Sequence, residues 1–234
     1  MSHSKLYLVP TLLHAEANLL TLPQETVDIL RGIKHWVVET EKNARAFLKK
    51  AGVLTPQSEL VLHLLNEHTK PTEIGTYLDA ALQGHPIGLM SDAGLPAIAD
   101  PGALVVDMAH RIGIEVVPLT GPSSIFLALM ASGLNGQQFT FHGYLPIDKI
   151  LRIKKIKALE QQQGHTHIFI ETPYRNQAMF DELLRTCQPA TKLCIGYGLH
   201  SSGQWIMTKN ISQWKHEVLK LEKNPAVFLL LSIR

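Results

Sequence analysis

The sequence predicts an α/β protein with two domains, residues 1–144 and 145–234. Strand-like and helical segments alternate through the first part, which is typical of crossover connections and a mainly parallel sheet. The second part holds two strand-like runs close enough to pair as a hairpin, which favours an α+β domain. The charge also changes sign near the joint. Residues 1–146 carry 9 basic and 13 acidic side chains, a net of −4, whereas residues 147–234 carry 13 and 7, a net of +6.

Five short runs of apolar or β-branched residues in the first part are expected to be strands. They cover residues 6–9, 35–39, 87–90, 115–119 and 139–143. The helices expected between them cover residues 41–51, 72–83, 104–110 and 125–132. Pro71 and Gly84 bracket the second of these helices, at positions that start and stop a helix. Ligands on parallel sheets bind outside the carboxyl ends of strands, so we expect a site in the loops that follow them.

The second part is expected to begin with a helix that carries five cations, namely Lys149, Arg152, Lys154, Lys155 and Lys157. The elements expected after it are a strand over 165–171, a helix over 176–187, hairpin strands over 191–197 and 204–208, a short helix over 211–218 and a last strand over 226–233. This order predicts a mixed, largely antiparallel sheet.

Composition and missing motifs exclude several classes of protein. Hydrophobic residues make up 45% of the chain, enough for a sizeable core, and the net charge of +2 argues against a strongly basic nucleic-acid protein. We recognise no signal peptide, membrane span or P-loop, and expect a cytoplasmic protein. Cys187 and Cys194 lie in no metal-ligand cluster. His165 and His167 share one face of a predicted strand, where we interpret them as surface residues, so no metal is expected.

Glycine and proline are concentrated in residues 91–102, directly after the predicted strand over 87–90. Glycine lets a ligand approach the backbone, and proline stiffens a loop. Asp100 is expected to cap the next helix, with Pro101 as its first residue. A cap does not account for Ser91 to Pro96, where we expect a ligand to bind.

A second such loop precedes the predicted helix over 125–132. It reads Thr120-Gly121-Pro122-Ser123-Ser124. The free N–H groups at a helix start suit a carboxylate or phosphate. The alternative is a serine cap with no ligand.

At these loops the sequence resembles the tetrapyrrole methylase superfamily, and most of all its branch of ribosomal small-subunit RNA 2′-O-methyltransferases. Residues 91–102 reproduce that branch's S-D-A-G-x-P-x-x-x-D-P-G motif. Further matches are residues 119–123 (L-T-G-P-S), 132–134 (S-G-L), 143–146 (G-Y-L-P) and 171–175 (E-T-P-Y-R). The resemblance implies a two-domain tetrapyrrole-methylase-like fold with S-adenosyl-L-methionine in the cleft between the domains, usually within a homodimer.

Carried over by position, the resemblance implies the cofactor contacts of this chain. They are Ser91, Asp92, Ala93, Gly94, Gly121, Ser123, Ser124, Tyr144, Leu145, Pro225 and Ala226. Methyl transfer is an in-line displacement, so alignment supplies much of the rate, although a hydroxyl nucleophile benefits from a base. Glu171 and Asp100 are the candidate catalytic carboxylates, and Arg175 is a candidate anchor for a substrate phosphate. The alternative for Glu171 and Arg175 is a structural ion pair.

The chain departs from the family pattern in three places. Residues 10–14 lack the glycine of the family's first loop, residues 39–42 replace its E-D-T-R, and residues 195–200 replace its A-R-E-L-T-K. We therefore expect a short, divergent relative without the C-terminal extension. The leading prediction is a methyltransferase acting on ribosomal RNA at a ribose 2′-O. The alternatives are a tetrapyrrole or another small molecule as substrate, and a non-catalytic protein that binds the cofactor.

Overall fold

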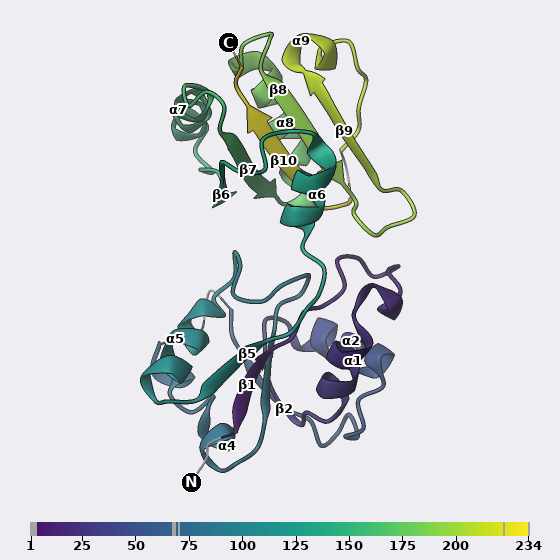
Figure 1. Cartoon of the computed structure of the whole chain (residues 1–234), viewed down its shortest axis with the longest axis vertical. Helices are drawn as coiled ribbons and strands as arrows, with labels where there is room; N and C mark the ends of the chain where they lie inside the picture. The colour runs from purple at the N-terminus through teal and green to yellow at the C-terminus, as the bar shows by residue number, and fades with distance from the viewer. Residues whose placement is uncertain (1–3, 67–68, 70, 222, 234) are drawn as a thin grey trace. The chain divides into compact units, whose positions relative to one another are not determined.

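The computed structural model describes residues 4–66, 69, 71–221 and 223–233 (Figure 1). Contacts within the chain divide it into two compact units, one ending at Ser123 and the other beginning at Ser124. We predicted the joint after Tyr144, at the charge change. The two units are described separately.

The first unit contains a parallel sheet of five strands, in the order β3-β2-β4-β1-β5. The strands are β1 (Lys5–Leu8), β2 (His35–Val38), β3 (Val61–Leu64), β4 (Ile87–Met90) and β5 (Glu115–Pro118). The predicted parallel sheet is confirmed. The sequence prediction missed β3, which lies at the edge of the sheet and is only partly buried.

Helices connect these strands and cover both faces of the sheet. They are η1 (Leu19–Thr21), α1 (Gln24–Arg31), α2 (Glu41–Ala51), α3 (Pro71–Ile74), α4 (Asp79–Leu82) and α5 (Ala103–Arg111). The single helix predicted over residues 72–83 is wrong: α3 and α4 are separate, and Gly75, a poor helix former, follows α3. Fully buried Trp36 and Leu48 lie in one apolar cluster, and Leu6 and Leu78 in another.

The second unit contains a mixed sheet of five strands, in the order β6-β7-β10-β8-β9. The strands are β6 (Phe139–Tyr144), β7 (Thr166–Glu171), β8 (Lys192–Tyr197), β9 (Trp205–Asn210) and β10 (Ala226–Leu231). Only the β6–β7 pair is parallel, which confirms the largely antiparallel prediction. We predicted residues 139–143 as a strand of the first sheet. They pair instead with β7 in the second sheet. A local sequence pattern predicts a strand but does not show which strand it pairs with.

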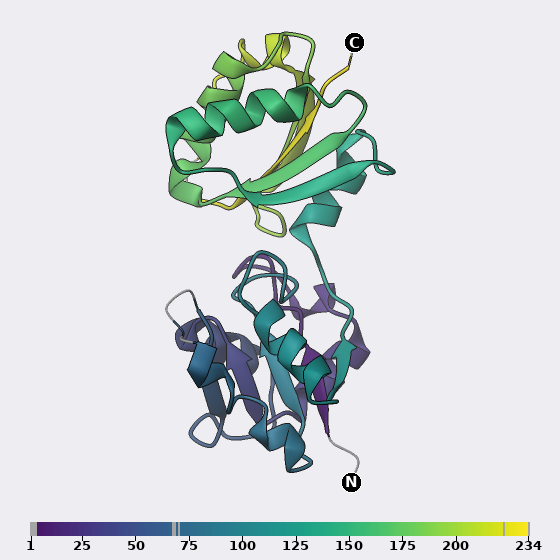
Figure 2. The same ribbon diagram turned by 90° about the vertical axis from the view of Figure 1, so that its left-hand side faces the viewer.

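The second sheet is covered on both faces, as Figure 2 shows for α7 and α6. The helices of this unit are α6 (Ser124–Ser132), α7 (Lys149–Glu160), η2 (Pro173–Arg175), α8 (Asn176–Thr186) and α9 (Ile211–Trp214). Helices α7 and α8 pack on the face that buries Phe169, Phe228 and Leu193. Helix α9 ends four residues before the predicted limit, Val218, and Trp214 at its end is fully buried in this core.

The interpretation of His167 as a surface residue is wrong, because its side chain on β7 is 1% exposed. Its Nδ1 lies 3.0 Å from Nε2 of His142, and its ring centroid lies 4.9 Å from that of His165. Burial, and then the neighbouring His142 and His165, lower the pKa of His167 to about 4, and Lys155 acts in the same direction. His167 is therefore neutral in the folded protein near neutral pH.

A pH-dependent stability follows from His167. Its folded pKa lies below the ordinary 6.5, so the unfolded chain takes up a proton first, and stability falls as the pH drops from about 6.5 to about 4. His167→Gln should reduce this fall, measured as the free energy of urea unfolding at several pH values. His216→Gln, at an exposed position, is the control. An unchanged pH dependence in the His167 variant would contradict the assignment.

Candidate methyltransferase site

Four loops meet at the carboxyl ends of the strands of the first sheet. The loops after β1 and β4 are joined directly: the Thr11 N–H donates to the carbonyl of Gly94 at 2.9 Å, and the Thr11 hydroxyl donates to the carbonyl of Ser91 at 3.3 Å. Ser91 is buried, whereas Asp92 and Ala93 are exposed. The loop after β4 therefore presents Asp92 and Ala93 to a ligand from a fixed backbone.

Two glycines allow the loops to approach this closely. Gly94 has a φ of +79°, and an added Cβ would lie 3.1 Å from Leu13 Cδ2 and 3.6 Å from the Pro122 carbonyl. At Gly121 an added Cβ would lie 2.3 Å from both Cβ and Cγ of Pro10. The loops after β1, β4 and β5 thus pack around positions where a side chain does not fit.

Asp92 is held by the loop after β2 and by helix α2. Its Oδ2 accepts hydrogen bonds from the Thr40 hydroxyl and from Asn43 Nδ2, both at 2.8 Å. Its N–H donates to Glu39 Oε2 at 3.1 Å. Sequence reasoning missed Glu39, Thr40 and Asn43 as site residues. The signal that could have found them is their position after a strand next to β4.

Asp100 organises the loop rather than capping the helix as predicted. Helix α5 begins at Ala103, and its N-cap is Gly102, without a side-chain cap. Asp100 Oδ1 accepts from the N–H groups of Ala97 and Gly102, at 3.0 and 2.7 Å, so it closes a local turn before the helix starts. Ala97 and Ala99 have φ values of 64° and 63°, a left-handed conformation that is costly for alanine and often found at functional sites.

Two carboxyls face one small cavity behind this loop. The cavity, of about 10 Å³, is lined by Glu39 and Asp100 together with Ser91 and Gly102. Burial is the largest cause that raises the pKa of both carboxyls. The hydrogen bond from the Asp92 N–H lowers the pKa of Glu39, whereas the charges of Asp92 and Asp100 raise it. The backbone N–H groups of Gly102 and Ala97 lower the pKa of Asp100 but only partly offset its burial. Asp100 Oδ2 is buried and has no hydrogen-bond partner among the described residues.

The raised pKa of Asp100 predicts a loss of stability with rising pH. The folded state holds this proton more tightly than the unfolded chain, so stability decreases as the pH rises from about 4 through the folded pKa. Asp100→Asn keeps an acceptor for Ala97 and Gly102 and removes the buried charge. We expect its stability relative to the natural chain to improve between pH 4 and pH 7 in urea unfolding. Asp107→Asn, at an exposed position, should give no such trend; equal behaviour of the two variants would refute the prediction.

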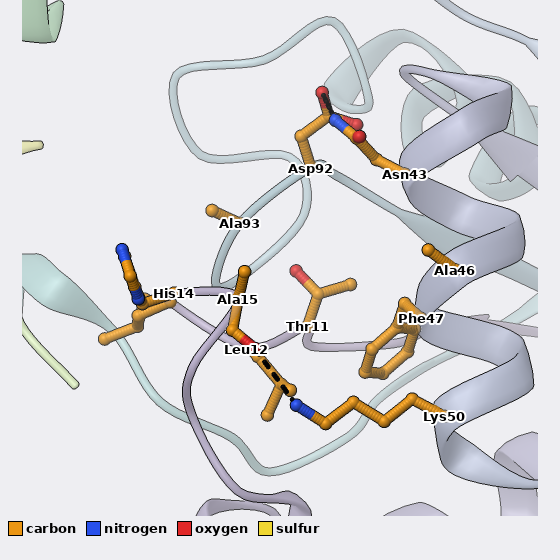
Figure 3. A pocket seen from close by; sticks show the side chains of 11 residues that line it. Thr11, Leu12, His14, Ala15, Asn43, Ala46, Phe47, Lys50, Asp92 and Ala93 are labelled. Atoms are coloured by element: carbon orange, nitrogen blue, oxygen red, sulfur yellow. Dashed lines mark hydrogen bonds between the residues drawn. The ribbon is translucent and has the colours of Figure 1, made fainter. Parts of the chain in front are cut away.

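A pocket of about 390 Å³ opens beside Asp92 and Ala93 (Figure 3). Its walls come from the loop after β1, from α2 and from the loop after β4. The lining residues are Thr11, Leu12, Leu13, His14, Ala15, Asn43, Ala46, Phe47, Lys50, Asp92 and Ala93. Lys50 Nζ donates to the carbonyls of Ala15 and Ala17, at 3.1 and 2.7 Å, which fixes the loop on that side.

In the second unit, several of the predicted site residues lie together at one end of the strands of the second sheet. Strands β6 and β7 end there with Tyr144 and Glu171, and β10 begins there with Ala226, which pairs with Glu171. The carbonyl of Pro225 accepts from the Gly198 N–H at 2.9 Å. Leu145 is 1% exposed and packs in the core, whereas Tyr144 is 52% exposed.

Glu171 and Arg175 form an ion pair, with Arg175 Nη2 2.6 Å from Glu171 Oε2. The other oxygen of Glu171 accepts from the N–H and hydroxyl of Thr172, at 2.8 and 3.3 Å. The Glu171 side chain is 1% exposed. The structure therefore contains the ion pair that the sequence analysis gave as the alternative for Glu171 and Arg175. Both oxygens of the Glu171 carboxylate already accept hydrogen bonds.

The described chain holds the predicted residues in two sets. Ser91, Asp92, Ala93, Gly94, Asp100, Gly121 and Ser123 lie in the first unit, and Ser124, Tyr144, Leu145, Glu171, Arg175, Pro225 and Ala226 in the second. Among the described residues, no three His, Cys, Asp or Glu side chains are placed to hold a metal ion. No helix in this part of the chain is long and apolar enough to cross a membrane.

Solved structures with a similar fold are methyltransferases. The methyltransferase CobJ aligns over 99% of this chain and 95% of its own, with a TM-score of 0.65 and 14% identity. The uroporphyrin-III-C-methyltransferase of Thermus thermophilus aligns over 98% of this chain and 92% of its own, with a TM-score of 0.59 and 15% identity. The chain thus has the two-domain fold of the tetrapyrrole methylases, as predicted.

Several sequence relatives share the name "Ribosomal RNA small subunit methyltransferase I". The Vibrio cholerae protein is 34% identical over 73% of this chain and 56% of its own length, and the Xylella fastidiosa protein 37% identical over 68% and 56%. The Bacillus subtilis protein is 35% identical over 73% and 55%. No family model matches the chain. The chain is a relative of these methyltransferases and spans a little over half of their length.

Proposed function

We propose that this chain is an S-adenosylmethionine-dependent methyltransferase that acts on ribosomal RNA at a ribose 2′-O. The observation that carries the proposal is the loop over residues 91–102, which has the family motif and lies at the carboxyl ends of a parallel sheet with its backbone held by Thr11. The shared name of the sequence relatives supports the RNA substrate.

The residues of the first unit fit the cofactor. Gly94 and Gly121 let the loops pack closely on one another, and the exposed residues Asp92 and Ala93 offer the cofactor one polar and one small side chain. The cofactor supplies an activated methyl group, and the carboxylate of Asp92 favours its cationic form electrostatically. From the family resemblance we also propose cofactor contacts for Ser123, Ser124, Tyr144, Pro225 and Ala226. Leu145 is buried in the core of the second unit, so we assign it to holding the neighbouring Tyr144 in place.

Of the two candidate bases, Asp100 is the one with an oxygen that accepts no hydrogen bond from the described residues, but this oxygen is buried behind the loop and would have to be exposed to reach a substrate hydroxyl. Glu171 is saturated by Arg175 and Thr172, so we assign the pair to holding the end of β7 in place. Asp100 has a free Oδ2 and a raised pKa, and a carboxylate with a higher pKa is a stronger base. Arg175 retains further N–H groups for a substrate phosphate.

We further propose a cytoplasmic homodimer, in line with the family resemblance. Helix α6 exposes Phe126 and Met130, at 51% and 79%, which is the kind of apolar surface that oligomers bury. Light scattering should give twice the 26.0 kDa mass of one chain. A single-chain mass at micromolar concentration would reject the dimer.

The proposed function is tested by mapping 2′-O-methylation on small-subunit ribosomal RNA from cells with and without the gene. We expect one ribose position to lose its methyl group and to regain it when the purified chain and S-adenosylmethionine are added. An unchanged map, with retained cofactor binding, would favour a small-molecule substrate such as a tetrapyrrole. An unchanged map without cofactor binding would reject the methyltransferase.

A further inference from the structure

We infer that the pocket beside residues 91–94 receives one nucleotide of the RNA, with its base against helix α2 (Figure 3). This inference rests on the proposed function and names the substrate subsite. Small-molecule pockets span roughly 300–1,000 Å³, and this pocket, at about 390 Å³, is near the lower limit. That size suits a single nucleoside better than a macrocycle of four pyrrole rings.

The pocket lies next to the cofactor loop rather than on it. Of the residues assigned to the cofactor, only Asp92 and Ala93 line the pocket, whereas Gly94, Gly121 and Ser123 do not. An occupant would therefore contact the side of the loop that faces α2. A methyl acceptor must lie directly beside the cofactor, because the nucleophile has to line up with the methyl group.

The walls of the pocket match the chemistry of a nucleobase. Leu12, Ala46 and Phe47 form an apolar wall, and RNA-binding proteins place unstacked bases against apolar and aromatic side chains. Asp92 Oδ2 already accepts two hydrogen bonds, but Oδ1 accepts none from the residues that the structure describes. This oxygen can accept a hydrogen bond from a ring N–H or an exocyclic amino group of a base.

The charges of the pocket disfavour a ligand with several carboxylates. Lys50 is the lysine of the lining, and its ammonium group is already bound to the carbonyls of Ala15 and Ala17. Asp92 adds a negative charge on the opposite wall. A ligand with several carboxylates would be repelled by Asp92, and the ammonium group of Lys50 is already hydrogen-bonded within the protein. A neutral base carries no charge for Asp92 to repel.

Filling the pocket tests the inference. Ala46 is an exposed residue of α2 that lines the pocket, so Ala46→Phe can occupy it without disturbing the core. We expect at least a tenfold rise in KM for small ribosomal subunits reconstituted with unmethylated RNA. The affinity for S-adenosylhomocysteine, measured by calorimetry, should stay within twofold. Ala158→Phe, at an exposed position of α7 outside the lining, is the matched control for the added aromatic ring.

A second readout does not depend on activity. With S-adenosylhomocysteine bound, nucleoside monophosphates should give saturation-transfer NMR signals with the natural chain and the control but not with Ala46→Phe. A parallel loss of S-adenosylhomocysteine affinity would show that the pocket holds the cofactor, and unchanged KM and NMR signals would show that no nucleotide binds there. If the natural chain itself does not bind S-adenosylhomocysteine, the proposed function fails first.

Discussion

Replacing Gly94 with valine is expected to weaken S-adenosylmethionine binding by more than about 100-fold, which corresponds to ~2.7 kcal/mol. The residue has a φ of +79°, and a Cβ would lie 3.1 Å from Leu13 Cδ2. The branches of valine extend further toward the loops after β1 and β5. Valine must therefore displace Leu13 or the loop itself, and a displaced loop carries its exposed residues Asp92 and Ala93 with it. Calorimetric titration of the variant measures the loss.

Gly113→Val is the matched control for this substitution. Gly113 has a φ of +76°, so valine meets the same backbone strain there, but no atom lies within 4 Å of an added Cβ. The two variants should lose similar amounts of stability from the backbone, roughly 1–2 kcal/mol. Only Gly94→Val should lose cofactor binding. Equal affinities of the two variants would show that the loop over residues 91–102 does not contact the cofactor.

Replacing Gly121 with alanine is expected to destabilise the protein by roughly 1–3 kcal/mol, the usual cost of overpacking. The added methyl would lie 2.3 Å from two ring carbons of Pro10, whereas carbon atoms in favourable contact are ~3.5–4.0 Å apart. A proline ring cannot turn away as a flexible side chain can. The free energy of urea unfolding measures the loss.

Gly136→Ala serves as the control for the Gly121 variant, because no atom lies within 4 Å of a Cβ at Gly136 and its φ is not positive. Its stability should change by no more than about 0.5 kcal/mol. If the two alanine variants are equally stable, Pro10 does not pack on Gly121 as described.

The predictable parts of the fold are those with a local signal. Strands β1, β2, β4 and β10 are short apolar runs, and α2 ends just before Gly52, whose left-handed conformation is typical of the residue that stops a helix. The sheet to which β6 belongs depends on its pairing with β7, which joins residues 26 or 27 positions apart in the chain, such as Phe139 with Thr166 and Tyr144 with Ile170. Local periodicity carries no information about such pairing, and the same holds for the edge strand β3.

The candidate site was predictable where a sequence motif marks it. The loop over residues 91–102 was found from its glycines, prolines and family pattern, whereas Glu39, Thr40 and Asn43 were not. Their contacts with Asp92 join residues 49 to 53 positions apart, so they appear only when β2 and β4 are adjacent. Gly88 on β4 is a similar case, because its role is to make room for the ring of Trp36, 2.3 Å from an added Cβ.

Calorimetric titration with S-adenosylmethionine tests the central claim most directly. The natural chain should bind one cofactor per chain, with a dissociation constant in the micromolar range or below, and Gly113→Val should bind it equally well. Gly94→Val should produce no binding heat at the same concentrations. Absence of binding to the natural chain, or undiminished binding to Gly94→Val, would contradict the assignment of the loop over residues 91–102 to the cofactor.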